Sequence, residues 1–494
     1  MFFNPEVLHH FHRMFWDHDV QWCIHVIGDA ELDFRFSIIQ TPVGYCAFDE
    51  GISKLKQVTG RDHRAVQRYI IGIVAGKAPH KFLTAVRALL DFRYLAQAPV
   101  FTTRSLDRVT AALQEFHDNK DAIISQGARA NWEIPKLELL QGMVPSIRES
   151  GATMQWSADI TEHAHVKEIK IPVRAGNNQN YYSQITRHLD RLEKCFCFDL
   201  ATYIDRHMDQ PSRFSEDELD GDDEHEPDAE TSALAGYHTP THSIVNYFAT
   251  SSALQQGLFP SAPQPFRTFA TSTTAFHLAT KPSLRLTINE ASIVHGVPNL
   301  IHAISTFFSQ QNDNSTLNGD RRLQVWHKLR VQQTSYHNKG TLEAPQTLRS
   351  IPPSTTNLYG LYDSVIVSPL PESNWPRSGL GGHSVVQLRL IFCLLESNTF
   401  AAYVQPFDIV PRSGPNNTCA MTGMHVLKRA AWANGERIGK VIPLTFIRSP
   451  AHLIPQFGRE AHPHLTRSSS YELSNEFWLN KYWSKEFYYA LSSV

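Results

Sequence analysis

Two clusters of histidine and acidic residues are the main candidates for chemistry in the sequence. In the first, His9 and His12 are three residues apart and Glu6 and His10 are four apart, so each pair can share one face of a helix. Imidazole and carboxylate groups at that spacing can bind a divalent metal. The same spacing is typical of surface or hydrogen-bonded histidines beside a buried aromatic stripe. Both interpretations stay open.

The second cluster is a short run later in the N-terminal half. Asp159, Glu162 and His163 can converge on one helical face, and His165 follows closely. Such a group could hold a divalent cation or act as a general base. The alternative is the start of a helix that is capped by Asp159 or Thr161.

A third candidate is a basic stretch with interleaved aromatic residues, formed by Arg321, Arg322, Trp326, His327, Lys328 and Arg330. Phosphate contacts and base stacking in a nucleic-acid site need these residue types. Lys328 and Arg330 also alternate as the solvated face of a strand does. The sequence contains no Walker loop, dinucleotide fingerprint, GxSxG or HExxH motif, and the glycines of Gly379–Gly382 are expected to form a turn.

The residues that precede position 208 show helical periodicity. Apolar residues recur three and four positions apart, and Gly60, Pro79 and Pro99 separate the runs. We therefore expect a mainly α-helical N-terminal half, with helices around Leu8–Trp22, Ala65–Ile73, Phe82–Leu95, Leu106–Ile124 and Tyr181–Ile204.

The C-terminal half is dominated by short runs rich in Val, Ile and Phe, which predict a small antiparallel sheet or barrel. We expect strands at Gln324–Gln332, Tyr362–Val367, Val385–Leu394, Phe400–Asp408, Met424–Lys428 and Lys440–Pro443. A helix is expected around Asn289–Phe308, and Tyr237–Phe276 is expected to have little regular structure. The aromatic tail, Phe477–Tyr489, should close the sheet domain.

The chain of 494 residues has a net charge of −2, which hides a strong segregation. Residues 1–207 are balanced, residues 208–230 carry −10, and residues 231–494 carry +8. A run of like charges with few apolar residues cannot collapse into a core. The fold class is therefore predicted as α+β with three parts: a helical region 1–207, a linker 208–264 and a module 265–494.

Composition also excludes several protein classes. The longest apolar stretch, Val385–Leu395, is interrupted by Gln387 and Arg389, so a membrane span is not expected. The N-terminus lacks the basic region of a signal peptide. Six scattered cysteines provide neither a disulfide framework nor paired zinc knuckles, which favours a reducing compartment.

An ordered series of motifs runs through the chain: Pro5–His12, Trp16–His18, Gly28–Phe36, Gly51–Gly60, Val86–Tyr94, Phe116–Lys120, Ile134–Leu137, Thr161–His165, Asn177–Tyr181, Tyr403–Phe407, Val441–Leu444, His452–Gly458 and Glu476–Tyr482. This series resembles Plavaka-type transposases, which are CACTA-related cut-and-paste elements of fungal genomes. The resemblance covers roughly residues 4–207 and 265–494. It corresponds to the region downstream of the catalytic strands and to the C-terminal module.

The resemblance implies a ribonuclease-H-like core in which three carboxylates hold two divalent metals, Mg²⁺ or Mn²⁺, for DNA cleavage and strand transfer. It places Glu6 at an acidic position of the family and Glu162 at the last metal carboxylate, with His163 and His165 beside it. The first aspartate of the family belongs to strands upstream of this pattern. We therefore expect a transposase-derived protein without catalysis of its own.

The leading functional hypothesis is a nuclear protein that binds DNA or chromatin through its basic C-terminal half. A homo-oligomer is compatible with it, whereas a membrane or a small-molecule substrate is not expected. Two alternatives stay open. One is a protein-interaction module that uses exposed aromatic residues of the tail around Trp478–Tyr489, with the helical half as a dimerisation surface. The other is a metal-dependent nuclease that works with the upstream strands supplied in trans.

Overall fold

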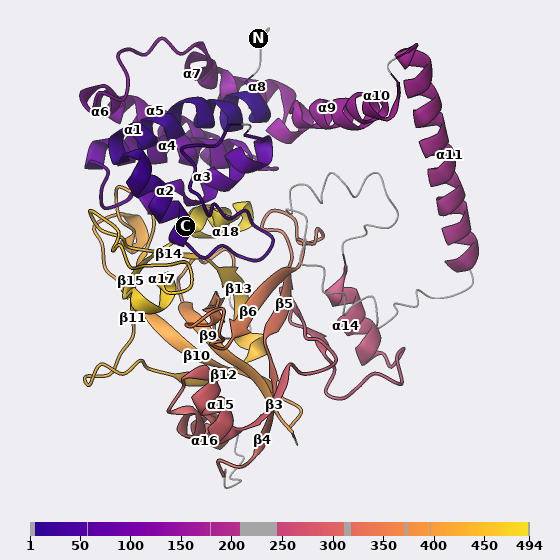
Figure 1. Cartoon of the computed structure of the whole chain (residues 1–494), viewed down its shortest axis with the longest axis vertical. Helices are drawn as coiled ribbons and strands as arrows, with labels where there is room; N and C mark the ends of the chain where they lie inside the picture. The colour runs from indigo at the N-terminus through magenta and orange to yellow at the C-terminus, as the bar shows by residue number, and fades with distance from the viewer. Residues whose placement is uncertain are drawn as a thin grey trace.

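The helices of the N-terminal half and the two sheets occupy opposite ends of the molecule (Figure 1). The computed structural model describes residues 5–56, 58–177, 179–207, 245–310, 318–370, 374–395 and 397–492. Residues up to 207 are helical wherever they have regular structure, and residues 268–479 contain the strands. The α+β layout predicted from the sequence is confirmed.

The N-terminal half begins with two π-helical segments, Val7–Arg13 and Phe15–Val20. The helices that follow are α1 (Gln21–Ile27), α2 (Asp29–Ile38), α3 (Gly60–Val74), α4 (His80–Ala96), α5 (Thr103–Asn119), α6 (Asp121–Ser125), α7 (Pro135–Leu139), α8 (Met143–Ser150), α9 (Asp159–Ala164), α10 (Ile171–Ala175) and α11 (Tyr181–His207). The predicted helix Leu106–Ile124 is therefore two helices, which meet at Lys120.

Local sequence signals fix where the central helices begin. Thr59 and Asp62 form a capping box at the start of α3, and Thr102 and Ser105 form one at the start of α5. Such boxes satisfy two of the free backbone N–H groups of a first turn. Helix α4 is buried along most of its length, which makes it the central helix of this half.

Two antiparallel sheets form the C-terminal half within the described residues. The five-stranded sheet has the order β1 (Thr268–Ala270), β2 (Thr274–His277), β5 (Lys328–Gln333), β6 (Gln346–Ile351) and β7 (Leu361–Tyr362). The ten-stranded sheet contains β3 (Leu284–Thr287), β4 (Arg322–Trp326), β8 (Ser364–Val367), β9 (Ser384–Leu394), β10 (Phe400–Val410), β11 (Val426–Arg429), β12 (Lys440–Pro443), β13 (Ile447–Ala451), β14 (Leu453–Pro455) and β15 (Glu476–Leu479). The sheet structure is thus larger than predicted.

Strands β9 and β10 form the centre of the large sheet and are buried on both faces. Their alternate residues enter different cores: Ile391 and Cys393 face the five-stranded sheet, whereas Leu390 and Phe392 face the helices α15 (Ile288–His295) and α16 (Leu300–Gln310). This alternation follows from the two-residue period of a strand. The predicted single helix Asn289–Phe308 is broken after His295, where Gly296 adopts a left-handed conformation.

Two further sequence predictions are corrected by the structure. The expected strand Gln324–Gln332 is divided at His327 into β4 and β5, which belong to different sheets. Residues 245–276, expected to lack regular structure, contain α14 (Tyr247–Gln255), β1 and β2. Tyr247 is buried and stacks on His277, so this part of the predicted linker is folded against the sheet. Residues 208–244 of that linker lie outside the described residues.

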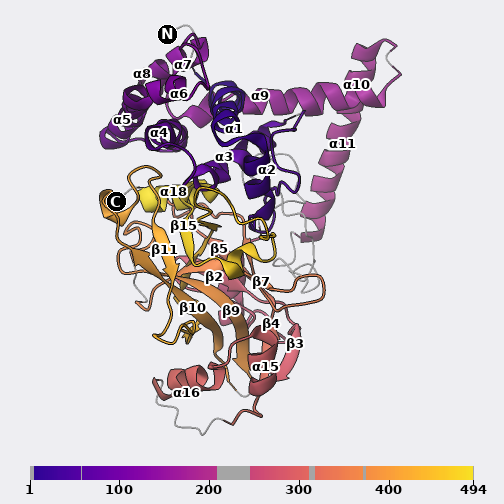
Figure 2. The same cartoon turned by 60° about the vertical axis from the view of Figure 1, so that its left-hand side comes forward.

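The helical half and the sheets share one hydrophobic core. Val426, Trp478 and Ile454 are cross-strand neighbours on β11, β15 and β14, and all three belong to the core cluster of the N-terminal helices. Helix α3 lies so close to β14 that a Cβ atom on Gly72 would be 2.7 Å from the Ile454 side chain. The two halves are therefore packed as a single body, as Figure 2 also shows.

The aromatic tail is the main element of this junction. It includes most of β15 and the beginning of α18 (Lys485–Ser492), and α17 (Ser470–Leu473) precedes it. Tyr482, Tyr488 and Tyr489 pack into the helical core, whereas Phe477 and Trp483 pack into a core behind the sheet. The tail closes the sheet domain as predicted, and it also joins that domain to the helices.

Candidate functional site

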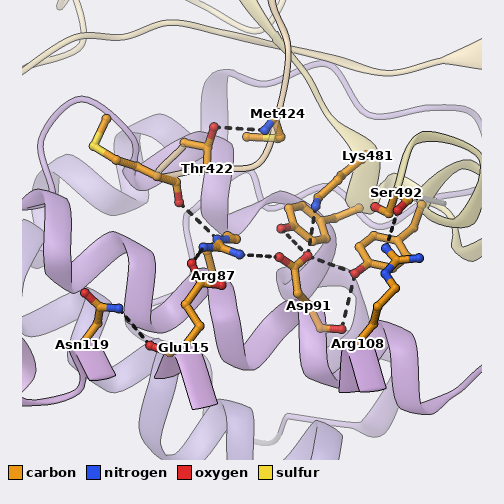
Figure 3. A network of polar contacts seen from close by, with 12 residues as sticks. Arg87, Asp91, Arg108, Glu115, Asn119, Thr422, Met424, Lys481 and Ser492 are labelled. Atoms are coloured by element: carbon orange, nitrogen blue, oxygen red, sulfur yellow. Dashed lines mark hydrogen bonds and ion pairs between the residues drawn. The ribbon is translucent and has the colours of Figure 1, made fainter. Parts of the chain in front are cut away.

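The candidate site is a polar cleft of about 530 Å³ at the junction of the two halves. Helices α4 and α5 form one side, and residues 415–423 with the C-terminal tail form the other. Figure 3 shows its floor, where side chains from both halves point toward one another. A volume of this size lies within the range typical of ligand sites.

Asp91 on α4 is the centre of the floor. Its carboxylate accepts hydrogen bonds from Arg87 Nη1 at 2.8 Å and from the hydroxyl groups of Tyr482 at 2.9 Å and Tyr488 at 3.1 Å. Lys481 Nζ lies 3.0 Å from the same carboxylate. Arg87 and Asp91 are four residues apart on α4, so the helix itself aligns this pair. The other three partners come from the far end of the chain.

Electrostatics keeps Asp91 ionised. Burial alone would raise its pKa, but the charges of Lys481 and Arg87 outweigh burial and lower the pKa to about 2. Burial and the nearby Asp91 carboxylate raise the pKa values of Tyr482 and Tyr488 well above their ordinary range. The two phenols therefore stay neutral hydrogen-bond donors, and the carboxylate stays negative.

A glycine allows Lys481 to reach the floor. Gly423 has a φ of +64°, and a Cβ atom at this position would lie 3.0 Å from Lys481 Nζ. Any other residue would be strained in this conformation and would crowd the ammonium group. The loop before β11 is thus shaped to the lysine side chain.

The rim of the cleft carries an excess of positive charge. Four basic residues line the cleft against two acidic ones, Asp91 and Glu115. Both acids are already paired, since Arg87 contacts Glu115 as well as Asp91. Arg104 and Arg108, four residues apart on α5, have no acidic partner in the described part of the chain. Arg108 donates a hydrogen bond to the backbone carbonyl of Ser492.

This arrangement suits an anion. The buried cations at the floor are neutralised by Asp91 and Glu115, whereas Arg104 on the rim is exposed and Arg108 is half-buried. Guanidinium groups bind phosphate and carboxylate groups through two parallel hydrogen bonds. The cleft can therefore hold an anionic group at its rim without losing the ion pairs of its floor.

The residues predicted from the sequence lie elsewhere. Glu6 caps the first π-helical segment, where it accepts hydrogen bonds from the backbone N–H groups of Leu8 and His9. Its carboxylate also accepts from the N–H of Ala158 at 3.4 Å. Burial would raise the Glu6 pKa, but hydrogen bonds from His10, His9 and Leu8 lower it to about 2. Glu6 is thus an ionised cap in this structure.

The histidines of the first cluster do not share a face. In a π-helix the backbone bonds span five residues rather than four, so positions three apart diverge. His9 is half-exposed beside Glu6, whereas His12 is buried and its Nδ1 lies 3.0 Å from Gln67 Oε1. These are the hydrogen-bonded histidines that the sequence analysis kept as an alternative.

The structure brings the two predicted carboxylates to one region, though not into one site. Ala158, which contacts Glu6, is the residue before α9, and it accepts a hydrogen bond from the backbone N–H of Glu162. Glu162 and His165 are exposed to solvent, and the side chain of His163 lies outside the described residues. Among the side chains that are described, no group of three or more His, Cys, Asp or Glu residues could hold a metal ion.

The basic stretch is divided between two sheets. Arg322 on β4 and Lys328 on β5 are exposed, and Arg321 is half-buried. Arg330 donates to the hydroxyl of Tyr247 at 3.3 Å. Trp326 is 1% exposed and donates to the carbonyl of Ala279. The expectation that this tryptophan could stack on a base is therefore wrong, because its ring is part of the core.

The tail is not an exposed aromatic surface either. Trp478 is 8% exposed, Trp483 is 4% exposed and Tyr482 is completely buried. The expectation that these aromatic residues are exposed is therefore wrong, because they are buried at the junction. Gly379–Gly382 lies in a turn, as predicted.

The cleft was not predicted from the sequence, although two signals mark it. Arg87 and Asp91 are charged residues within the mainly apolar run Phe82–Leu95, and Lys481 interrupts an aromatic run. Charges in apolar segments are rarely buried unless they are paired. That rule predicts partners for all three residues, but it does not say that they are partners of one another.

Comparison with known proteins gives one match. A family described as a domain of unknown function, DUF6830, matches residues 248–427. The matched region extends from α14 to β11 and thus contains most of the two sheets and the 415–423 side of the cleft. No curated protein and no solved structure matches the chain. No described helix combines the length and the apolar character that a membrane span requires.

Proposed function

We propose that this protein binds nucleic acid and that the cleft between α4, α5 and the C-terminal tail holds backbone phosphates. The observation that carries the proposal is the pair of arginines on its rim, Arg104 and Arg108, which no described acidic residue neutralises. Contacts of this kind supply most of the sequence-independent affinity for nucleic acid. A transposase-derived origin and a nuclear location, both expected from the family resemblance, are part of the same proposal.

The cleft supports this proposal better than the basic stretch on the strands does. Arg104 and Arg108 are one helical turn apart and line a cavity, whereas Arg322 and Lys328 lie on strands of different sheets. The aromatic residue of that stretch, Trp326, is buried. The proposal therefore moves the phosphate contacts from the strands to the rim of the cleft.

The rim of the cleft and the basic stretch on β4 and β5 can be compared by reversing their charges in the full-length chain. Binding of a fluorescent DNA duplex of mixed sequence is measured by anisotropy over a range of salt concentrations. The R104E/R108E variant should bind much more weakly, and its slope of log affinity against log salt should be smaller by about two, one for each lost phosphate contact. The matched control, R322E/K328E, reverses two exposed charges outside the cleft and should bind within about twofold of the unmodified chain.

Two outcomes contradict the proposal. One is no binding by the unmodified chain at low salt. The other is a loss of affinity in R322E/K328E that equals or exceeds the loss in R104E/R108E, which would return the phosphate contacts to the strands. Circular dichroism of each variant separates lost binding from lost folding.

A further inference from the structure

The structure contains an arm that packs on none of the sheets. It consists of α9, the π-helical segment His165–Lys170, α10 and the long helix α11. In Figures 1 and 2 the arm projects from the helical half, and α11 runs beside the body rather than into it. With 27 residues, α11 is roughly 40 Å long at 1.5 Å per residue. The arm thus presents a long helix to solvent.

One face of α11 is apolar and uncovered. Leu189, Leu192, Phe196 and Leu200 follow one another at steps of three and four residues, which places them on one side of a helix. Leu192 is 53% exposed and Phe196 is 38% exposed. The ends of this face are less open, since Ile185 near α10 is buried and Leu189 and Leu200 are half-buried. These four residues are called the α11 stripe below.

An uncovered apolar stripe on a projecting helix needs a partner, because water is a poor solvent for contiguous apolar surface. The chain that follows α11 is not suited to cover it, since residues 208–230 contain eleven acidic residues and few apolar ones. The stripe continues over about three turns, at the period of a helix that pairs with another helix. A second α11 has the same period and the same apolar side chains.

Charge complementarity indicates which way two such helices would run. Residues 165–194, up to the middle of α11, contain six basic and three acidic residues. Residues 199–230 contain two basic and thirteen acidic residues. In a parallel pair the two acidic segments would leave from the same end and repel each other. In an antiparallel pair each acidic segment begins beside the basic region of the other chain.

We propose that two copies of this chain associate through the α11 stripe, with the two α11 helices antiparallel. The stripe provides the apolar contact, and the basic region 165–194 of each copy faces the C-terminal end of the other α11, residues 199–207, where the acidic segment begins. This inference is independent of the proposed nucleic-acid binding, since no residue of the cleft belongs to the arm.

Sedimentation of the full-length chain over a range of concentrations tests the association. The unmodified chain should form dimers that dissociate on dilution. L192E/F196E should be monomeric throughout, and the milder L192A/F196A should dissociate at higher concentration than the unmodified chain. The matched control is F198E, because Phe198 is 71% exposed on the same helix but lies two positions from Phe196 and so faces away from the stripe.

The control makes the result specific to the stripe. F198E should sediment as the unmodified chain does, and the far-ultraviolet circular dichroism of all variants should be the same. The proposal is refuted if the unmodified chain is monomeric at every concentration, or if L192E/F196E forms dimers as readily as F198E.

Salt tests the orientation. Attraction between the basic and acidic regions of an antiparallel pair is screened by salt, so the dimer should weaken as salt increases. In a parallel pair salt would screen the repulsion between the acidic segments and strengthen the dimer. A dimer that tightens with salt would therefore overturn the antiparallel arrangement.

Discussion

Replacement of Asp91 by asparagine should destabilise the whole protein, because this carboxylate joins its two halves. Asp91 belongs to α4, whereas Lys481, Tyr482 and Tyr488 belong to the C-terminal tail. Asparagine keeps the size of the side chain and one acceptor oxygen. It removes the negative charge that neutralises Lys481, which is only 7% exposed.

The size of the effect follows from two considerations. The pKa of Asp91 is lowered from 3.8 to about 2, and each pKa unit corresponds to about 1.4 kcal/mol, so the ionised form contributes about 2 kcal/mol at neutral pH. Loss of one partner of a buried ion pair costs about 3–5 kcal/mol, because the other charge stays buried. We therefore expect D91N to lower the free energy of unfolding by about 2–5 kcal/mol.

The pH dependence has a definite sign. Because the folded-state pKa of Asp91 is lowered, its stabilising contribution is present above pH 3.8 and is lost as the pH falls toward 2. D91N should therefore lower the free energy of unfolding most at neutral pH and progressively less as the pH falls. Urea unfolding followed by tryptophan fluorescence at several pH values measures both effects.

Two further variants make the experiment decisive. Glu115 also contacts Arg87, but its side chain is 39% exposed. E115Q should therefore lower the free energy of unfolding by about 1 kcal/mol or less. The double variant D91N/K481M removes the Lys481 charge together with that of Asp91, leaves Arg87 paired with Glu115, and should be more stable than D91N. The reasoning is refuted if D91N costs no more than E115Q, or if the double variant is less stable than D91N.

The other two predictions concern carboxylates outside the cleft. Burial and the nearby Glu486 raise the pKa of Glu343 to about 7, so its stabilising contribution is full below pH 4.5 and is lost as the pH rises to 7. At about 1.4 kcal/mol per pKa unit, the free energy of unfolding changes by about 3 kcal/mol over this range. E343Q should remove this change from the urea stability profile, and an unchanged profile would contradict this. Glu472 contacts Arg389 and Arg437, each at 2.5 Å, so E472Q should leave guanidinium groups uncompensated and lower the melting temperature by several degrees. If calorimetry gives a melting temperature within one degree of that of the unmodified chain, a structural role for these two ion pairs is contradicted.

Much of the fold could be predicted because its signals are local. The apolar period of Phe82–Leu95 predicts α4, and the apolar runs Val385–Leu394 and Phe400–Asp408 predict β9 and β10 almost to the residue. Each depends on the side chains of one segment and on the period of its own backbone. The breaks at His327 and Gly296 were missed, because an apolar run does not show where the chain changes sheet or direction.

The cleft could not be predicted, because its residues meet only through tertiary packing. Asp91 and Tyr482 are 391 residues apart, and nothing in either segment identifies the other. The π-helical start of the chain was missed for a related reason. The residues around His9 and His12 have an ordinary helical pattern, and nothing in their sequence shows that the backbone takes the wider π-helical turn.

The position of the cleft links binding to stability. Arg104 and Arg108 come from the helical half, whereas the residues opposite them come from the loop before β11 and from the tail. The complete cleft therefore exists only while the two halves are packed together. A ligand that binds only the packed form stabilises that form in proportion to the logarithm of its concentration. Asp91 acts on the same equilibrium from within the cleft, since its ion pairs fix Lys481 and the tail beside α4. If the rim binds phosphates as proposed, loss of Asp91 should weaken that binding, because the tail would no longer be fixed beside α4. The opposite effect would be expected from charge alone, since Asp91 is an anion.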